Sequence, residues 1–348
     1  MTITATPGNT RFRKHQIGIQ TLLNTAVPAT YVLPWRGAIT FNPNTTDPDV
    51  DVGSLDPILA PYRMAQEVAT TMTGPLPYDP LVIRLSAGLK GGVAPVTVGT
   101  NGRRWTYQLA SLTADVFDVY SDEWGDDTSD AATTPNSDGI LGFGALVNVL
   151  EETMPEDLGP WTVNDQWVFS GATFGNRTAG LTVDANPEWV FGADSKFYLD
   201  SAVGNIGTTE ISNTVHGATI RVSNNLDLKR FANGNSTRFN LAGYGRGPRV
   251  IEVVLTVAKT AAMIAERATL DDDPVPTRYL AVTTTSTQFA GTGIPFSYDR
   301  RGAFRLFDVS DGEQGSNSTM ILTYRAFYDS TLGYAYRALV NNALTALP

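Results

Sequence analysis

The same order of strand and helix patterns occurs twice along this chain. The first series starts with an alternating segment at residues 37–42 and continues through a long polar loop, a strand, a helix, another strand and a closing strand-turn-strand. The second series starts at residues 217–223 and follows the same order. Alternation of apolar and polar residues is typical of strands with one buried face. The repetition predicts a duplicated β-sandwich or barrel, each copy with one α-helix.

Two segments carry helix signals. Residues 79–89 begin with Asp-Pro and place leucines on one face, which predicts a helix that is capped by Asp79 and ended by the glycines at 91–92. Residues 261–268 are good helix formers, and Thr260 precedes them as a cap. The remaining patterns predict strands at 62–72, 104–109, 115–120, 145–150, 161–169, 250–257, 278–284, 302–307 and 319–328.

These patterns divide the chain into three parts. Residues 1–175 are expected to form the first unit with an N-terminal arm, and residues 216–348 the second unit with a C-terminal segment. Between them, residues 176–215 are rich in Gly, Asn and Thr but include strand-like stretches, so a structured connector is expected there.

Composition supports two packed units. A chain of 348 residues with 42% hydrophobic residues can bury two cores of ordinary size. The absence of cysteine excludes disulfides, thiolate metal sites and cysteine nucleophiles, and it suits assembly in a reducing cytoplasm. The polar start does not resemble a signal peptide, and no apolar run is long enough to cross a membrane.

The net charge argues against a nucleic-acid-binding protein. The formal net charge is −10, whereas proteins that bind DNA place Lys and Arg against phosphates. We therefore expect no DNA affinity, although an acidic surface also simply keeps a protein soluble.

No catalytic or cofactor motif is found in the sequence. The only histidines are His15 and His216, and no Gly-x-Ser-x-Gly elbow or phosphate-binding loop occurs. The glycine-rich run at 243–247 is interpreted as a loop tip. The sequence predicts a protein that is not an enzyme and that carries no cofactor.

Acidic clusters at residues 47–51, 122–127 and 271–273 leave two alternatives open. Their oxygens could hold calcium, but the EF-hand spacing is missing. Paired acids could also hydrolyse glycosidic bonds, although no pair stands out. We therefore assign no metal ligand and no catalytic residue.

Two long loops differ in the sign of their charge. Residues 42–61 contain only acidic charges and residues 224–249 mostly basic ones, which suggests docking between subunits. The alternative is that both loops are solvated and their charge is accidental. The interface candidates are Asp47, Asp49, Asp51, Asp56, Lys229, Arg230, Arg238, Arg246 and Arg249.

Short segments spread over most of the chain resemble the major tail protein, or tail tube protein, of long non-contractile-tailed bacteriophages, particularly the actinobacteriophage group. They are GIQT at 18–21, TAVPAT at 25–30, LPWRG at 33–37, DPDVDVGSLDP at 47–57, LGPWTV at 158–163, KRFANG at 229–234 and GYGRG at 243–247. None of them is a catalytic signature.

The resemblance implies a structural virion protein. Its fold would be a β-sandwich with one helix, whose strands join those of neighbouring subunits into an inner β-barrel. Rings of six such folds would stack into the tail tube, through which DNA passes without being bound. Two copies per chain would give trimeric pseudo-hexameric rings. One copy with an outer decoration would give hexameric rings.

The resemblance also implies a location and partners. The protein would assemble in the host bacterial cytoplasm and reside in the virion tail, with no membrane contact. Its partners would be further copies of itself, the tape measure protein, the tail terminator and the distal tail proteins. The alternatives are another β-sandwich virion protein, such as a capsid or receptor-binding protein, and, less favoured, a carbohydrate-active enzyme.

Overall fold

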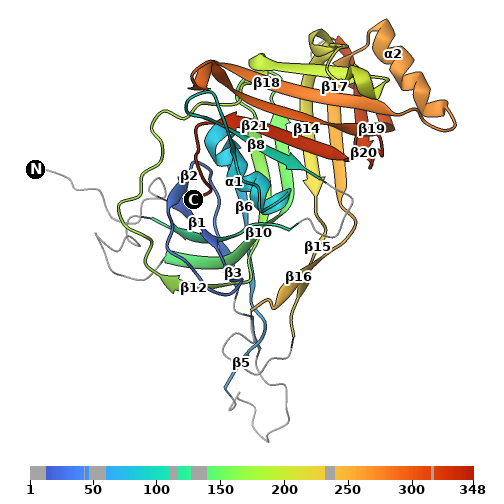
Figure 1. Ribbon diagram of the computed structural model, residues 1–348. Coiled ribbons are helices and arrows are strands. Elements are labelled where there is room, and N and C mark those ends of the chain that lie inside the picture. The colour runs from blue at the N-terminus through green and yellow to red at the C-terminus, as the bar shows by residue number, and fades with distance from the viewer. Residues whose placement is uncertain are drawn as a thin grey trace, which may run out of the picture.

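The computed structural model describes residues 13–42, 44–46, 60–109, 116–126, 139–231, 240–314 and 317–348. The fold is mainly β, with 55% of residues in strands and 11% in helices. Antiparallel sheets dominate it, as the alternating sequence pattern predicts, and two α-helices lie within the described part of the chain (Figure 1).

The largest sheet runs through both halves of the chain and is called here the long sheet. Its strands lie in the order β3, β6, β11, β10, β14, β17, β20, β19, and every pairing is antiparallel. Their bounds are β3 Thr40–Asn42, β6 Glu67–Pro75, β10 Gly139–Met154, β11 Thr162–Val168, β14 Val215–Ser223, β17 Val250–Ala258, β19 Ile294–Gln314 and β20 Asn317–Ala326. Because β10 pairs directly with β14, the two halves form one continuous sheet.

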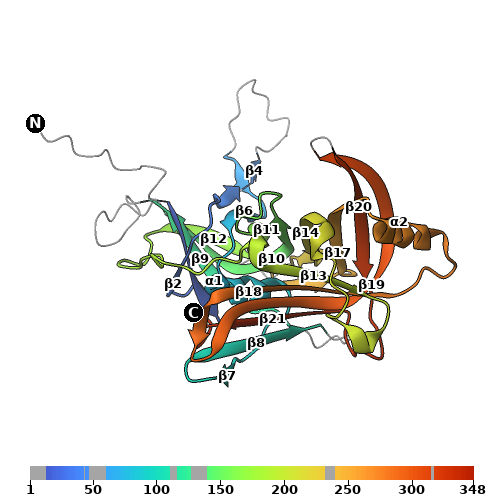
Figure 2. The same cartoon turned by 90° about the horizontal axis from the view of Figure 1, so that it is seen from above.

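A second, outer sheet branches from β19. The first part of β19 pairs with β18 on one edge and with β21 on the other. The sheet continues to β13 beyond β18, and to β8 and β7 beyond β21. The bounds are β7 Val96–Val98, β8 Gly102–Gln108, β13 Ser195–Asp200, β18 Arg278–Gly291 and β21 Tyr336–Asn342. Figure 2 shows β8, β18 and β21 as one layer beside the strands of the long sheet.

A third, smaller sheet is attached through β10. The first part of β10 pairs with β9 and β12, and β1 joins β9 to β2. Their bounds are β1 Lys14–Gln20, β2 Tyr31–Leu33, β9 Val119–Gly125 and β12 Gly171–Gly175. The register of β10 against β9 shifts between Gly142 and Ala145, and Gly144 lies there at φ 68°. A glycine adopts this conformation without strain, so β10 can change from one sheet to the other at this point.

Helix α1 (Tyr78–Gly88) lies inside the molecule between the long and outer sheets (Figure 1). Nearly all of its residues are buried, which explains why its sequence lacks the polar face of a surface helix. The predicted cap is wrong, because Pro77 precedes the first turn and Asp79 lies within it. The backbone N–H groups of Leu76 and Tyr78 donate to Trp161 and Glu188, and this pairing fixes where the helix begins.

The end of α1 packs directly on β10. A Cβ atom added to Gly88 would lie 2.7 Å from Cβ of Val147 and 2.9 Å from Cγ of Leu150. We expect Gly88→Ala to lower the free energy of unfolding by about 1–3 kcal/mol through overpacking, measured by urea denaturation. Gly204→Ala is the control, because a Cβ there meets no atom within 4 Å. Equal stability of the two variants would contradict close packing.

Helix α2 (Ala261–Ala268) has the predicted cap. The hydroxyl of Thr260 accepts a hydrogen bond from the backbone N–H of Met263 at 3.3 Å. Only Met263 and Glu266 of this helix are buried, so α2 lies at the outside of the molecule, where Glu266 accepts a hydrogen bond from Arg278 of β18 at 2.9 Å (Figure 1).

Two short ribbons project from the same end of the long sheet (Figure 1). One is β4 (Thr45–Thr46) with β5 (Tyr62–Arg63), and the other is β15 (Leu226–Lys229) with β16 (Gly243–Arg246). The interpretation of residues 243–247 as a loop tip is therefore wrong, because most of them form β16. Short 3-10 helices complete the described elements: η3 Gly192–Asp194, η4 Val203–Asn205, η5 Ser212–Thr214 and η6 Thr269–Asp271.

Candidate assembly surface and its buried support

One face of the long sheet is open to solvent, and we call it the open face. Side chains alternate along each strand, so every second residue points away from the core. The partly or fully exposed residues on this face include Glu67, Thr71, Thr73, Glu151, Thr153, Asn164, Gln166, Thr219, Arg221, Glu252, Val254, Thr256, Arg305, Asp308, Ile321, Thr323 and Arg325. It is a broad polar surface that extends over strands of both halves.

Charged side chains cross the open face in one row. Arg221 lies opposite both Glu151 and Glu252 on the neighbouring strands, and Arg325 lies opposite Glu252. Nε of Arg221 is 3.7 Å from a carboxylate oxygen of Glu151, and Nε of Arg325 donates to Glu252 at 2.8 Å. Asn164 also donates to Glu151, at 3.0 Å. From Glu151 to Arg325 the row therefore alternates in sign, and Arg305 of β19 lies opposite Arg325 at its end.

The two ends of the long sheet present strand edges. From Arg305 to Gln314, β19 pairs with β20 on one side, and no described residue pairs with its other side. At the far end, β3 pairs with β6 on one side only, again within the described residues. Because all pairings between them are antiparallel, β3 and β19 run in opposite directions. A second copy could thus add its β3 edge to β19 in antiparallel fashion.

The structure places the predicted basic residues on and beside the β15–β16 ribbon. Lys229, Arg230 and Arg246 are exposed there, and Arg249 is half-buried. Some of them already have partners within the chain. Arg230 donates to the carbonyl of Gln66 at 2.9 Å, and the guanidinium of Arg246 lies 4.8 Å from the ring centre of Phe117.

The other predicted interface residues cannot be placed. Asp47, Asp49, Asp51, Asp56 and Arg238 lie outside the described residues. The strands that lead into the acidic loop, β4 and β5, project from the same end as the β15–β16 ribbon (Figure 1). Pairing of the acidic and basic loops between subunits stays a prediction.

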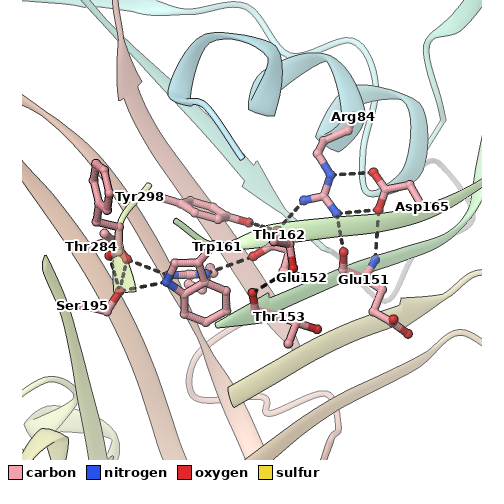
Figure 3. Close-up of polar contacts among 12 residues, drawn as sticks. Arg84, Glu151, Glu152, Thr153, Trp161, Thr162, Asp165, Ser195, Thr284 and Tyr298 are labelled. Carbon is pink, nitrogen blue, oxygen red and sulfur yellow. Dashed lines mark hydrogen bonds and ion pairs between the residues drawn. The ribbon is translucent and has the colours of Figure 1, made fainter. Parts of the chain in front are cut away.

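A buried charge network lies behind the open face, and the sequence patterns did not reveal it. Figure 3 shows Arg84 of α1 reaching Asp165 of β11 and Glu152 of β10. Its Nε and Nη2 each donate to an oxygen of Asp165 at 2.7 Å. Tyr298 donates to the same oxygen of Glu152 as Arg84 does, Oε1, at 2.7 Å, and Arg300 donates to the other oxygen, Oε2, at 3.0 Å.

This network joins three layers of the molecule. Arg84 comes from the helix, Glu152 and Asp165 from the long sheet, and Arg300 from β19 in the outer sheet. Arg300 also donates to Thr284 of β18 at 2.8 Å. All four charged side chains are buried, and two positive charges balance two negative ones. Since solvent does not reach these groups, we interpret the network as a brace between the three layers.

The charge state of Glu152 depends on this network. Burial alone would raise the pKa of its carboxyl group, but Arg84 and Arg300 outweigh burial and hold the pKa below its usual value. A lowered pKa in the folded state stabilises the protein above the unfolded pKa of about 4.3, and this contribution is lost as pH falls through the folded value.

We therefore expect the contribution of Glu152 to the free energy of unfolding to decrease as the pH is lowered below about 4, whereas Asp165, whose pKa is raised by burial, contributes with the opposite sign. Urea denaturation at pH 7, 5, 4 and 3 measures this decrease. In Glu152→Gln the part of the pH dependence due to Glu152 should be missing. A wild-type and a variant curve with the same slope below pH 4 would contradict the assignment.

The structure brings His15 together with two residues of one acidic cluster. His15 is buried and bonds Asp122 through Nδ1 at 2.8 Å, and the neighbouring Glu123 accepts hydrogen bonds from Thr178 and Ala29. Within the described ranges, no three His, Asp or Glu side chains gather in a way that could hold a metal ion. The described helices include none that is long and apolar enough to cross a membrane.

The open face, its strand edges and the two ribbons are thus candidate contact surfaces within the described residues. Comparison of the sequence with models of known protein families and with curated proteins finds no match.

Proposed function

We propose that this chain is a structural subunit of a phage tail tube. Copies would join edge to edge through the long sheet into rings, and the rings would stack into a conduit for DNA. The observation that carries the proposal is the continuous long sheet, which has an open polar face and, among the described residues, an unpaired edge on β19. A sheet closed into a ring removes edges that otherwise promote aggregation.

The strand order of the long sheet supports a duplicated tube fold. The first half contributes β3, β6, β10 and β11 to the long sheet, named here in chain order. Across the sheet, these strands lie in the order β3, β6, β11, β10. In the second half, β14, β17, β19 and β20 lie in the corresponding order β14, β17, β20, β19. In both halves a ribbon precedes the second strand and a helix follows it. We therefore favour a second tube fold over an outer decoration.

The duplication sets the expected ring. Each chain would contribute two folds, so that three chains supply six in a trimeric pseudo-hexameric ring. At each junction the β19 edge of one chain would lie antiparallel to the β3 edge of the next. The inner barrel would then be built from the long sheets of all three chains.

The ribbons suggest how rings stack. Both project from one end of the long sheet, so they would all point toward the same neighbouring ring (Figure 1). The exposed Lys229, Arg230 and Arg246 are the described candidates for contacts with that ring. The proposed location is the virion tail, with the tape measure, terminator and distal tail proteins as further partners.

Electron microscopy and native mass measurement of the purified chain at high concentration test this proposal. We expect open tubes or rings, each ring with the mass of three chains. Rings of six chains would retain the tube and refute the duplication. Compact monomers at every concentration, also in the presence of the distal tail proteins that begin assembly, would refute the proposal.

A further inference from the structure

The open face does not share the acidity of the whole chain. The protein has a formal net charge of −10. On the exposed side of the long sheet, however, the acidic residues Glu67, Glu151, Glu252 and Asp308 stand against Arg221, Arg305 and Arg325. This face is therefore close to neutral, and its arginines require an explanation if DNA passes along it.

Each of the three arginines already has a partner. Arg221 pairs with Glu151 at 3.7 Å, and Arg325 pairs with Glu252 at 2.8 Å. The guanidinium of Arg325 also lies 3.4 Å from the ring centre of Phe307. Arg305 lies over another ring, that of Phe327, at 4.5 Å. The positive charges are thus each placed beside a carboxylate or an aromatic ring, while the side chains of Arg221 and Arg325 stay 46% and 44% exposed.

Arginines without partners on this face would bind the phosphates of DNA and hinder its passage. Guanidinium groups bind phosphates with two parallel hydrogen bonds, and each neutralised phosphate adds a salt-dependent contribution to affinity. An adjacent carboxylate competes for the same donors and repels the phosphate. Among the described polar residues around them on the open face are Thr153, Thr219 and Thr323, which carry no charge.

We infer that Glu151 and Glu252 serve to block phosphate binding by Arg221 and Arg325, so that DNA does not adhere to the open face. This inference rests on the proposed function, because it takes the open face as the wall of the conduit. The inference gives a role to Glu151 and Glu252, which do not belong to the residues proposed for contacts between rings. It also identifies a latent DNA-binding surface on a chain whose net charge is acidic.

The test is the double variant Glu151→Gln/Glu252→Gln, which keeps side-chain size and the acceptor for Asn164. Fluorescence anisotropy of a labelled 20-base-pair DNA duplex measures binding to the unassembled chain at 50 and 200 mM salt. We expect no binding by the wild type. If two phosphates are contacted, the variant's affinity should fall roughly tenfold between these salt concentrations.

Two further variants make the result specific. Glu156→Gln/Asp157→Asn changes the net charge equally on the exposed turn between β10 and β11, outside the open face, and should gain no binding. Adding Arg221→Gln and Arg325→Gln to the first variant should abolish its gain. Urea denaturation verifies that all variants fold.

If the Glu151→Gln/Glu252→Gln variant binds DNA no better than the turn control, the inference is wrong. The same proteins are then examined for tubes by electron microscopy. Tubes together with no gain of binding would refute the inference alone. Wild-type chains that form no tubes with the distal tail proteins would refute the proposed function and remove the basis of the inference.

Discussion

Replacing Glu152 with glutamine is expected to lower the free energy of unfolding by about 3–5 kcal/mol. The carboxylate of Glu152 is buried between Arg84 and Arg300 and also accepts a hydrogen bond from Tyr298. Glutamine would leave a net positive charge in the core, where little water can solvate it. Urea denaturation at pH 7 measures the loss.

The adjacent residue provides the matched control. Glu151 lies on the opposite side of β10 and pairs with Arg221 on the exposed surface. Exposed ion pairs contribute about 0–1 kcal/mol, so Glu151→Gln should change stability little. If the two substitutions had equal effects, the buried network would not be the brace between α1 and the sheets.

The second large effect concerns assembly. Val309→Pro should prevent ring and tube formation while the chain stays folded. Gln314 and Asn317 pair across two connecting residues, and hydrogen-bonded pairs alternate along an antiparallel ladder. Gln314 next to this turn is taken as a residue that is hydrogen-bonded to β20. Every second residue before it along β19 is then bonded in the same way, and Val309 is not one of them. Its N–H therefore points away from β20. Proline would remove this donor from the edge without breaking the ladder to β20.

The proline would leave one hydrogen-bond acceptor on the neighbouring chain without a donor. This weakens the association between chains by about 1–3 kcal/mol. The concentration needed for assembly should therefore rise roughly tenfold to a hundredfold. Val309→Ala retains the N–H and is the control for the lost side chain, and electron microscopy over a concentration series compares the two. Tubes of Val309→Pro at the wild-type concentration would show that this edge makes no contact between subunits.

Local patterns predicted many elements of the fold. The alternation at 145–150, 161–169 and 250–257 corresponds to parts of β10, β11 and β17, and the cap at Thr260 is confirmed. The single strand expected at 62–72 is wrong, because β5 ends at Arg63 and β6 begins at Glu67. Register and sheet order depend on pairings between distant residues, which periodicity does not specify.

Local sequence patterns could not predict the buried network for a similar reason. Arg84 and Asp165 are 81 residues apart, and Glu152 and Arg300 are 148 apart. One signal was present, however. In a strand with alternating faces, the pair Glu151-Glu152 must direct one carboxylate inward, and a buried carboxylate requires a positive partner. The open face could not be separated from the core before the neighbours of each strand were known.

The most direct test of the tube proposal is a cryo-electron microscopy map of assembled tubes. We expect three chains per ring, with β19 of each chain antiparallel to β3 of the next and with Glu151, Arg221 and Glu252 facing the lumen. A map in which these side chains face the outer surface, or in which the β19 edge remains unpaired, would contradict the proposal.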